Sequence, residues 1–436
     1  MNKIIRKRFG LIGLLLLIGV ALVAVLKPSV HPAATLPLDT GNVAWLLTAS
    51  GLVLLMTPGL SFFYGGMVNS KNIISTMLQS MIAMGVITIL WFVVGFSLAF
   101  GDSLGGFIGN PFTFFMFNNV GTAPHPRLGS AIPLVLYAAF QLKFAIITPG
   151  LITGSFAERV KFWSYLIFIS LFSLLIYAPL AHWTWHPDGF LYKWGVLDFA
   201  GGTVVHISAG FAALAGAMVL GRRKTHQNNE THQVANLPYV IIGTALLWFG
   251  WFGFNAGSSL EANALAVDAF INTHLAAASG MFGWILFDSS RGKKPSAMGA
   301  CIGAVVGLVA ITPAAGYVAY GPALFIGLAA SIVSNVAVSL KTRTVLDDTL
   351  DVFPCHGLGG IVGMIFTAVF AQKGGLITGS SVLFVQHIKA LVVVSVFTFG
   401  GSWVLYVVVN HFFPMRVTPE EELIGLDISQ HGESIA

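Results

Sequence analysis

The sequence predicts an all-α polytopic membrane protein: eleven transmembrane helices, arranged as two inverted five-helix repeats and one final helix. Three observations predict this class. Hydrophobic residues make up 56% of the 436-residue chain and charged residues only 9%, whereas soluble domains carry about 25% charged residues. Eleven apolar segments follow an N-terminal leader, and the loops between them differ in basic charge. So few charges cannot cover a soluble surface, which excludes a soluble enzyme.

The net charge of +5 does not indicate a nucleic-acid-binding protein. The 22 basic residues are spread along the whole chain, and in a membrane protein such an excess belongs in cytoplasmic loops. We therefore expect a lipid bilayer, and no nucleic acid, around this chain. The two cysteines, Cys301 and Cys355, lie in apolar, glycine-rich segments, so no disulfide framework is expected.

Residues 1–34 have the form of a secretory leader. Four basic residues, at positions 3, 6, 7 and 8, precede an apolar run from Phe9 to Leu26, as in a signal peptide. The run is slightly long, and the small residues Ala33 and Ala34 are the nearest candidate cleavage site. Two interpretations stay open: a signal peptide that is removed and a signal anchor that is retained.

The segments after the leader have the lengths expected of transmembrane helices, which need about 20 apolar residues. The eighth and tenth are short and rich in glycine, which lets helices approach closely inside a membrane bundle. Together they predict a membrane domain over residues 40–415, followed by a tail at 416–436. The eleven segments are residues 44–64, 73–99, 132–156, 162–180, 201–220, 237–256, 269–287, 297–311, 317–338, 355–371 and 391–413.

Basic residues in the loops predict the orientation. One alternate set of loops carries twelve of them and the other set carries four. The positive-inside rule places the first set in the cytoplasm, so the mature N-terminus should lie outside and the tail inside an inner (cell) membrane. The twelve are Lys71, Arg159, Lys161, Arg222, Arg223, Lys224, Arg291, Lys293, Lys294, Lys341, Arg343 and Arg416, and the four are Arg127, Lys193, Lys373 and Lys389.

A weak internal repeat relates the two halves. Leu197-Asp198-Phe199 opens the fifth span, and Leu350-Asp351-Val352 precedes the tenth. A histidine in an apolar stretch follows each tripeptide: His206 in the first half and His356 in the second. Halves of five spans each have opposite topology, and inverted repeats of this kind place transport sites at mid-membrane between the halves. The two histidines should therefore meet near the pseudo-two-fold axis.

Ionisable residues inside a membrane are costly, and three of them stand out: Lys143, His206 and His356. A core histidine that hydrogen-bonds a neighbour is the ordinary explanation for either histidine alone. The paired placement favours a polar stripe in an apolar pore, because two neutral imidazoles can share one N–H and each keep a further donor or acceptor. Two histidines without a third ligand are incomplete for zinc, so neither a metal nor a cofactor is expected.

Aromatic residues gather near the segment ends. Phe140 and Phe144 lie on one helix face, Trp185 ends the fourth span, and residues 248–254 are dense in Trp and Phe. Most of these residues fit an interfacial aromatic belt, and some could form a cation–π cage at a pore mouth. Asp198 stands just before the fifth span, where a carboxylate can cap a helix N-terminus.

The acidic residues Asp347, Asp348 and Asp351 are expected to cap the tenth helix in the same way. The chain contains no Walker loop, dinucleotide fingerprint, nucleophile elbow or His-Glu-x-x-His motif. Nothing therefore points to ATP-driven transport or to hydrolysis, and we do not expect an enzyme.

Several longer motifs resemble the ammonium transporter (Amt/Mep/Rh) family, and its Amt branch most closely. The resemblance covers about residues 40 to 433, and the motifs are jointly specific. They are Thr57–Gly66 (TPGLSFFYGG), Ala145–Gly150 (AIITPG), Ala157–Phe162 (AERVKF), Asp198–His206 (DFAGGTVVH), Trp251–Ser258 (WFGFNAGS), Asp347–Phe353 (DDTLDVF) and Gly425–Glu433 (GLDISQHGE).

The resemblance implies a homotrimer in which each subunit is an eleven-helix bundle with its own pore. By position, Trp185, Phe144 and Ser258 resemble an outer site that recruits ammonium. The two rings would hold the cation, and the serine hydroxyl would accept a hydrogen bond. Phe140 and Trp251 would line the same vestibule.

The resemblance also implies the parts below this site. Phe144 and Phe254 resemble a stacked gate, and His206 and His356 resemble the twin-His pore of the family. Asp198 resembles a buried acid that orders the outer site without touching substrate. Since desolvating an intact cation is very costly, deprotonation at the outer site would let ammonia cross along the imidazoles and would give selectivity over alkali ions.

Some positions depart from the family pattern. Lys143 stands where a small or apolar residue is common, and a helix step of about 100° should turn it off the pore axis. Pro354, Cys355 and His274 are also unusual. The tail lacks the usual Tyr, which weakens the implied binding of a PII-type (GlnK-like) regulator at the cytoplasmic face.

The sequence thus predicts an inner-membrane ammonium transporter. A transporter-like ammonium sensor with slight transport is the first alternative, and uptake by a strain without its own carriers separates the two. An intramembrane His-dependent metalloenzyme is the second, and metal analysis of pure protein tests it.

Overall fold

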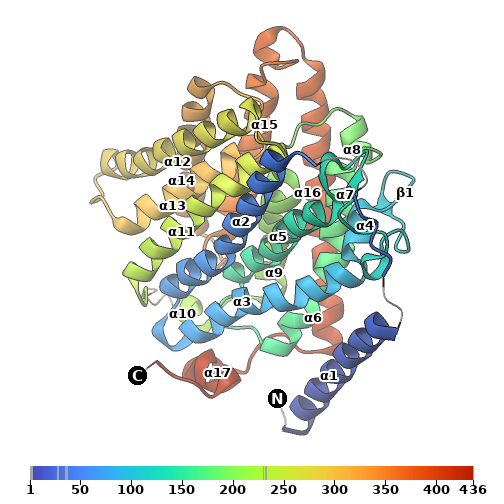
Figure 1. Cartoon of the computed structure of the whole chain (residues 1–436). Helices are drawn as coiled ribbons and strands as arrows, with labels where there is room; N and C mark the ends of the chain where they lie inside the picture. The colour runs from blue at the N-terminus through green and yellow to red at the C-terminus, as the bar shows by residue number, and fades with distance from the viewer. Residues whose placement is uncertain (1–2, 27–28, 35–37, 229, 231–232, 436) are drawn as a thin grey trace.

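The computed structural model is a bundle of helices that run between two ends of the molecule (Figure 1). It describes residues 3–26, 29–34, 38–228, 230 and 233–435. Within these residues eleven helices are long and apolar enough to cross a membrane. One of them is the leader helix α1 (Lys3–Leu26), and ten belong to the bundle. The shorter apolar helix α13 (Ala297–Ile311), of 15 residues, brings the bundle to the eleven spans that the sequence predicts.

The predicted spans are confirmed, and several are interrupted by π-helical turns. The third span, for example, begins two residues after its predicted start, and α13 begins and ends where expected. The spans are α2 (Thr40–Met67), α3 to α4 (Ile73–Leu90 and Phe96–Phe100), α5 (Leu134–Ile152), α6 to α7 (Phe162–Phe172 and Ala178–Trp185), α9 (Ser208–Leu220), α11 (Leu237–Ala256), α12 (Ala264–Ser290), α13, α14 (Tyr320–Lys341), α15 (Gly359–Phe370) and α16 (Val382–Phe412).

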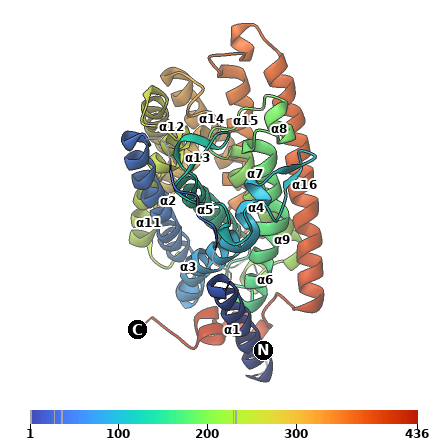
Figure 2. The same ribbon diagram turned by 45° about the vertical axis from the view of Figure 1, so that its right-hand side comes forward.

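Helix α16 begins well before the predicted residue 391 and runs along one edge of the bundle (Figure 2). Its first turns contain polar residues, but His387 is buried. The Nδ1 of His387 lies 2.8 Å from the carbonyl oxygen of Met364, and its Nε2 lies 3.0 Å from the amide nitrogen of Leu197. Because both ring nitrogens are bonded inside the protein, a polar residue here does not end the span.

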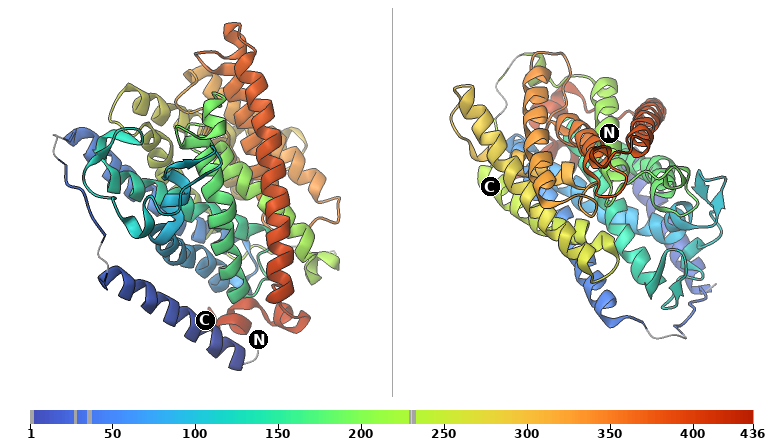
Figure 3. Two further views of the ribbon diagram at one scale, coloured as in Figure 1. Left: turned by 90° about the vertical axis from the view of Figure 1, so that its right-hand side faces the viewer. Right: turned by 90° about the horizontal axis from the view of Figure 1, so that it is seen from above.

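Short elements at one end of the bundle cover its mouth. They are the hairpins β1–β2 (Ser103–Leu104 with Ile108–Gly109) and β3–β4 (Pro124–His125 with Gly129–Pro133), and the short helix α8 (Phe190–Lys193). We call this the vestibule end, and the opposite end, which carries residues 416–435, the tail end. Seen from above, the helices of the bundle surround a central region (Figure 3).

The leader helix α1 lies on the outside of the bundle near the tail end (Figures 1 and 3), where Phe9 stacks on Trp163 and meets Phe413 edge-on, and most of its apolar surface is exposed. Residues 29–34, in contrast, are bound to the vestibule-end loop at residues 116–123. Six hydrogen bonds join Ser29 to Met116, Val30 to both Asn118 and Asn119, His31 to Val120, Pro32 to Ala123, and Ala34 to Thr122.

Residues at the tail end tie the tail to the loops between the spans. The buried Arg223 pairs with Asp347 at 2.9 Å and with Glu158 at 2.6 Å. Burial favours the neutral form of Asp347, but Arg159 and Arg223 hold the pKa of its carboxyl below its ordinary value. Asp427 accepts hydrogen bonds from the first amides of α3 and so fixes the tail against that helix.

The two halves of the bundle pack on one another reciprocally. His206 lies in a π-helical turn (η6, Gly202–Ile207) that leads into α9, and His356 lies in a similar turn (η8, Phe353–Leu358) that leads into α15. Turn η6 packs against α15, and η8 packs against α9. This exchange is what two inverted repeats require.

A glycine lets α9 approach the turn η8 closely. Gly210 follows His206 by one turn, and a Cβ at this position would lie 2.3 Å from the Cα of Gly357. That distance is shorter than any real contact, so Gly210→Val should overpack the crossing by at least about 1–3 kcal/mol. We expect loss of folded protein, measured by detergent gel filtration and thermal unfolding. Gly85→Val is the matched control, because its Cβ would meet open space, and a variant at Gly210 as stable as this control would contradict the prediction.

Candidate functional site

The two predicted pore histidines meet in the centre of the bundle. Their Nδ1 atoms lie 3.3 Å apart and their ring centroids 5.4 Å apart. Both side chains are buried. They border a cavity of about 10 Å³, which is room for about one water-sized molecule. Apart from the imidazoles and the indole of Trp251, its lining is aliphatic or phenyl: Met56, Leu60, Phe63, Ile147, Leu151, Val205, Leu247, Phe254 and Val305.

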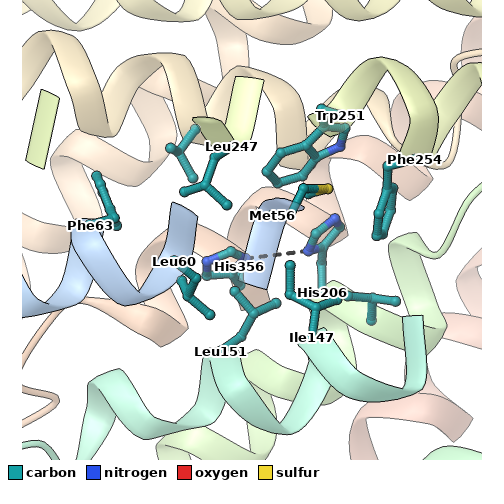
Figure 4. A pocket seen from close by; sticks show the side chains of 12 residues that line it. Met56, Leu60, Phe63, Ile147, Leu151, His206, Leu247, Trp251, Phe254 and His356 are labelled. Carbon is teal, nitrogen blue, oxygen red and sulfur yellow. Dashed lines mark hydrogen bonds between the residues drawn. The ribbon is translucent and has the colours of Figure 1, made fainter. Parts of the chain in front are cut away.

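Figure 4 shows the order of these residues along the cavity. His206 lies beside Trp251 and Phe254, and His356 lies on the side of Leu60 and Phe63. The indole of Trp251 stacks on His206 with an interplanar angle of 21°. The imidazole pair is therefore a short polar step in an otherwise apolar passage.

The hydroxyl group of Thr312, which does not line this cavity, contacts His206, the histidine nearer to the vestibule end. Thr312 follows α13, and its Oγ1 lies 3.3 Å from Nε2 of His206. The same oxygen accepts a hydrogen bond from the indole N–H of Trp251 at 2.9 Å and donates one to the carbonyl oxygen of Leu308 at 2.8 Å.

A column of rings leads from the imidazole pair to the vestibule end. Phe254 lies 6.0 Å from His206, measured between centroids, and Phe144 lies 4.3 Å from Phe254. Trp185 meets Phe144 edge-on at 5.7 Å. Because Phe144 and Phe254 are both buried and in contact, they close the passage between the inner cavity and the outer one.

The outer cavity, which we call the vestibule, has a volume of about 580 Å³. Trp185, Phe144 and Ser258 all line it, together with Gln141 and Asp198. The Ser258 hydroxyl donates to the carbonyl oxygen of Phe254 at 2.8 Å, so its lone pairs remain available to a donor such as an N–H group. The vestibule thus brings two aromatic rings and a hydroxyl acceptor together.

Asp198 organises both the vestibule and the pore turn. One carboxylate oxygen accepts from the amides of Gly201 and Gly202 at 2.8 and 2.6 Å, and the other accepts from the amide and hydroxyl of Thr203. These four bonds use the lone-pair positions of a carboxylate, which leaves none for a cation. The Asp198 carbonyl also accepts the indole N–H of Trp185 at 3.1 Å.

Two of the predicted site residues lie elsewhere than expected. Trp251 does not border the vestibule but lies one layer deeper, beside His206, because it precedes Phe254 by three residues, about 4.5 Å along a helix. Phe140 packs behind Phe144, at 5.0 Å between centroids, and borders neither cavity. The expectation that both residues line the vestibule is therefore wrong in position.

The counterpart of Asp198 in the second half is one of the three acids expected to cap the tenth helix, but not the one in the matching tripeptide. Asp348, and not Asp351, caps the turn that carries His356, accepting from the amide of Phe353 at 2.8 Å. Asp348 precedes its histidine by eight residues, as Asp198 does. Asp351 instead pairs with Lys341, and Asp347 pairs with Arg223, so only one of the three acids caps the helix.

The residues that depart from the family pattern line neither cavity. Lys143 is half-buried, borders neither cavity, and makes no hydrogen bond or ion pair within the described part of the chain. His274 is exposed on α12 beside Trp248, and Pro354 accepts a hydrogen bond from Ser334 in the turn of the lower histidine. Lys143 therefore lies off the pore axis, as a helix step of about 100° from Phe144 predicts.

Gln141 and Thr312 belong to the site but were not predicted. Gln141 borders the vestibule, and its Oε1 is buried without a hydrogen-bond partner among the described residues. An amide between two phenylalanines of an apolar span was an available signal. Thr312 stands one residue beyond the predicted end of its span, where a hydroxyl looks like an ordinary helix terminus.

The described residues contain no group of three or more His, Cys, Asp or Glu that could hold a metal ion.

The fold and the site define a polytopic membrane protein with an aromatic vestibule and, below it, a small and largely apolar inner cavity. Residues 44–435 match the Ammonium Transporter Family, and the chain belongs to this family. The family is one of transporters.

Known relatives agree over nearly the whole chain. A putative ammonium transporter of Methanothermobacter thermautotrophicus is 45% identical over 407 residues, which cover 91% of this chain and 98% of the relative. The ammonium transporter of Bacillus subtilis is 43% identical, with 91% and 98% covered. The crystal structure of Saccharomyces cerevisiae Mep2 has a TM-score of 0.83 at 33% identity and covers 88% of each chain. A structure titled Sensor Amt Protein has a TM-score of 0.83 at 31% identity, with 90% of this chain and 98% of that chain covered.

Proposed function

We propose that this protein transports ammonium across the inner membrane through one pore in each chain. The observation that carries the proposal is the continuous column from the vestibule ring Trp185 through Phe144 and Phe254 to the paired imidazoles. A cation that can lose a proton to become a neutral weak base fits such a passage, because an intact cation has no counter-charge there and its desolvation is costly.

Each part of the column has its own task in this proposal. Trp185 and Phe144 attract the cation through their π faces, while the Ser258 oxygen accepts one of its N–H groups. Above the closed ring pair the cation gives its proton to the water of the vestibule, where the proton remains, and neutral ammonia passes between the rings. His206 and His356 then offer it polar contacts across the apolar stretch.

Reconstituted liposomes test the function. We expect an ammonium gradient to drive flux that raises the internal pH, while an equal potassium gradient drives no flux; a current under the ammonium gradient would show that the proton crosses as well. Equal responses to the two cations, or no response to ammonium from folded protein, would contradict the proposal. High-affinity ammonium binding with negligible flux would instead favour the sensor.

Trp185→Leu should weaken recruitment without closing the pore. A desolvated cation–π contact contributes up to about 2 kcal/mol, so the half-saturating ammonium concentration should rise about tenfold while the maximal flux changes little. Trp194→Leu is the matched control, since this tryptophan lies at the same end but does not border the vestibule. An unchanged concentration dependence in Trp185→Leu would refute the recruitment role.

We further propose a homotrimer with the vestibule end outside and the tail in the cytoplasm. The basic loop residues Arg159, Arg222 and Arg223 lie near the docked tail, which is the arrangement that the positive-inside rule favours. The cytoplasmic face and the tail would receive a PII-type regulator. Mass measurement of the detergent-purified particle tests the trimer, and binding of a purified PII protein with and without residues 416–436 tests the regulator.

Residues 1–34 are proposed to act as a signal peptide or signal anchor. Removal of the whole segment would also remove the six hydrogen bonds that Ser29 to Ala34 make with the loop at 116–123. Those bonds favour a mature chain that keeps at least residues 29–34. The intact mass of the purified protein decides between a chain that begins after Ala34, one that begins earlier and one that keeps α1.

A further inference from the structure

The three polar contacts of the Thr312 hydroxyl oxygen can all be hydrogen bonds in only one set of directions. A carbonyl oxygen can only accept, so in that set the Thr312 hydroxyl hydrogen points to Leu308 O at 2.8 Å. An indole N–H can only donate, so one lone pair of the Thr312 oxygen is taken by Trp251 at 2.9 Å. One lone pair remains, and Nε2 of His206 lies 3.3 Å away.

His206 must therefore donate to Thr312, because the oxygen has no hydrogen left to give. A neutral imidazole carries one N–H, so with Nε2 protonated the Nδ1 of His206 is a lone pair. The contact of 3.3 Å between the two Nδ1 atoms is then a hydrogen bond in which His356 Nδ1–H donates to His206 Nδ1. It follows that Nε2 of His356 is unprotonated.

We propose that Thr312 is a positioning residue that fixes the tautomers of both pore histidines and so gives the pair a direction. The upper histidine, His206, then presents no free lone pair, since Thr312 holds its N–H and His356 fills its Nδ1. The lower histidine, His356, presents a free lone pair at Nε2, which is bonded to none of the described residues. Figure 4 shows this ring on the side of the cavity away from Phe254.

The consequence for transport rests on the proposed function. Ammonia that has passed Phe254 finds no basic nitrogen at His206, and its N–H groups are first accepted at Nε2 of His356. Thr312 would thus place the hydrogen-bond acceptor of the pore on the tail side of the imidazole pair, although its own side chain does not border the cavity.

Solid-state NMR of the ¹⁵N-histidine-labelled trimer in liposomes without ammonium tests the tautomers directly. We expect Nε2–H in His206 and Nδ1–H in His356, with resonances assigned by loss in His206→Gln and His356→Gln. The chain contains its own references: His182 and His387 each bond a backbone carbonyl through Nδ1, which fixes Nδ1–H in both. A wild-type His206 that carries its proton on Nδ1 would overturn the proposal.

Two variants at Thr312 distinguish an effect of its hydrogen bond from an effect of its side-chain packing. Thr312→Val removes the hydroxyl at nearly constant volume, and the loss of a single hydrogen bond should shift the tautomer ratio of His206 at least about fivefold. Thr312→Ser keeps the hydroxyl and should keep the wild-type ratio. An unchanged ratio in the valine variant, or a valine-like ratio in the serine variant, would refute the assignment. Should the valine variant fail to fold, the wild-type and serine spectra still decide.

Flux gives a second, independent readout. Thr312→Val should lower the maximal ammonium flux while leaving the half-saturating concentration unchanged, because the vestibule does not contain Thr312. A shifted tautomer ratio with unchanged maximal flux would overturn the claimed consequence for transport. Since the NMR measurement needs no transport, failure of the tautomer assignment and failure of the transport function give different results.

Discussion

Replacement of either pore histidine by alanine is expected to abolish selective ammonium flux while the bundle stays folded. His206→Ala or His356→Ala removes half of the imidazole pair from a cavity whose other described lining residues, apart from Trp251, carry apolar side chains. The remaining imidazole loses its 3.3 Å partner, and the enlarged cavity can admit water. We expect ammonium flux to fall at least tenfold, equivalent to about 1.4 kcal/mol of barrier, or discrimination against potassium to be lost.

The measurement is paired recording of ammonium and potassium responses from the same liposome preparation. His274→Ala is the matched control, because this histidine is exposed on α12 and lies outside both cavities. It should transport as the unchanged protein does. If both pore variants showed normal ammonium flux and normal selectivity, the imidazole pair would have no role in conduction, and the proposed passage would be wrong.

The spans and the imidazole pair could be predicted because both follow from rules that act over long stretches of sequence. A run of about 20 apolar residues has few alternatives to a membrane helix, and all predicted segments correspond to helices. Inverted halves bring equivalent positions together, which is why His206 and His356, 150 residues apart in the sequence, meet at 3.3 Å.

The parts that could not be predicted depend on single hydrogen bonds and on depth along a helix. Trp251 lies at the depth of the inner cavity because it precedes Phe254 by about one turn, and its indole N–H is held there by Thr312, a contact that no sequence pattern reports. Similarity of the two tripeptides relates Asp198 to Asp351, whereas the capping acid, Asp348, is the one that stands eight residues before its histidine, as Asp198 does. A capping carboxylate must reach fixed amides, so equal spacing to His206 and His356 is the physically relevant comparison.

Replacement of Asp198 is the other change expected to have a large effect, because one carboxylate supports two parts of the transport path. It accepts four hydrogen bonds at the start of the turn that carries His206, and its own carbonyl orients the indole of Trp185. A buried donor that loses its acceptor costs about 1–3 kcal/mol. Asp198→Ala orphans several such donors, so we expect a large loss of thermal stability and no measurable flux.

Asp198→Asn separates the charge from the shape. Asparagine fills the same space but has one acceptor oxygen instead of two, so the amide and hydroxyl of Thr203 lose their acceptor while Gly201 and Gly202 can keep theirs. We expect a folded particle with raised half-saturating concentration and reduced maximal flux together, since both the vestibule and the pore turn shift. Asp268→Asn, an acid that bonds the exposed Tyr320 hydroxyl, is the control. If Asp198→Asn matched this control in both thermal stability and ammonium transport, the carboxylate would not organise the path.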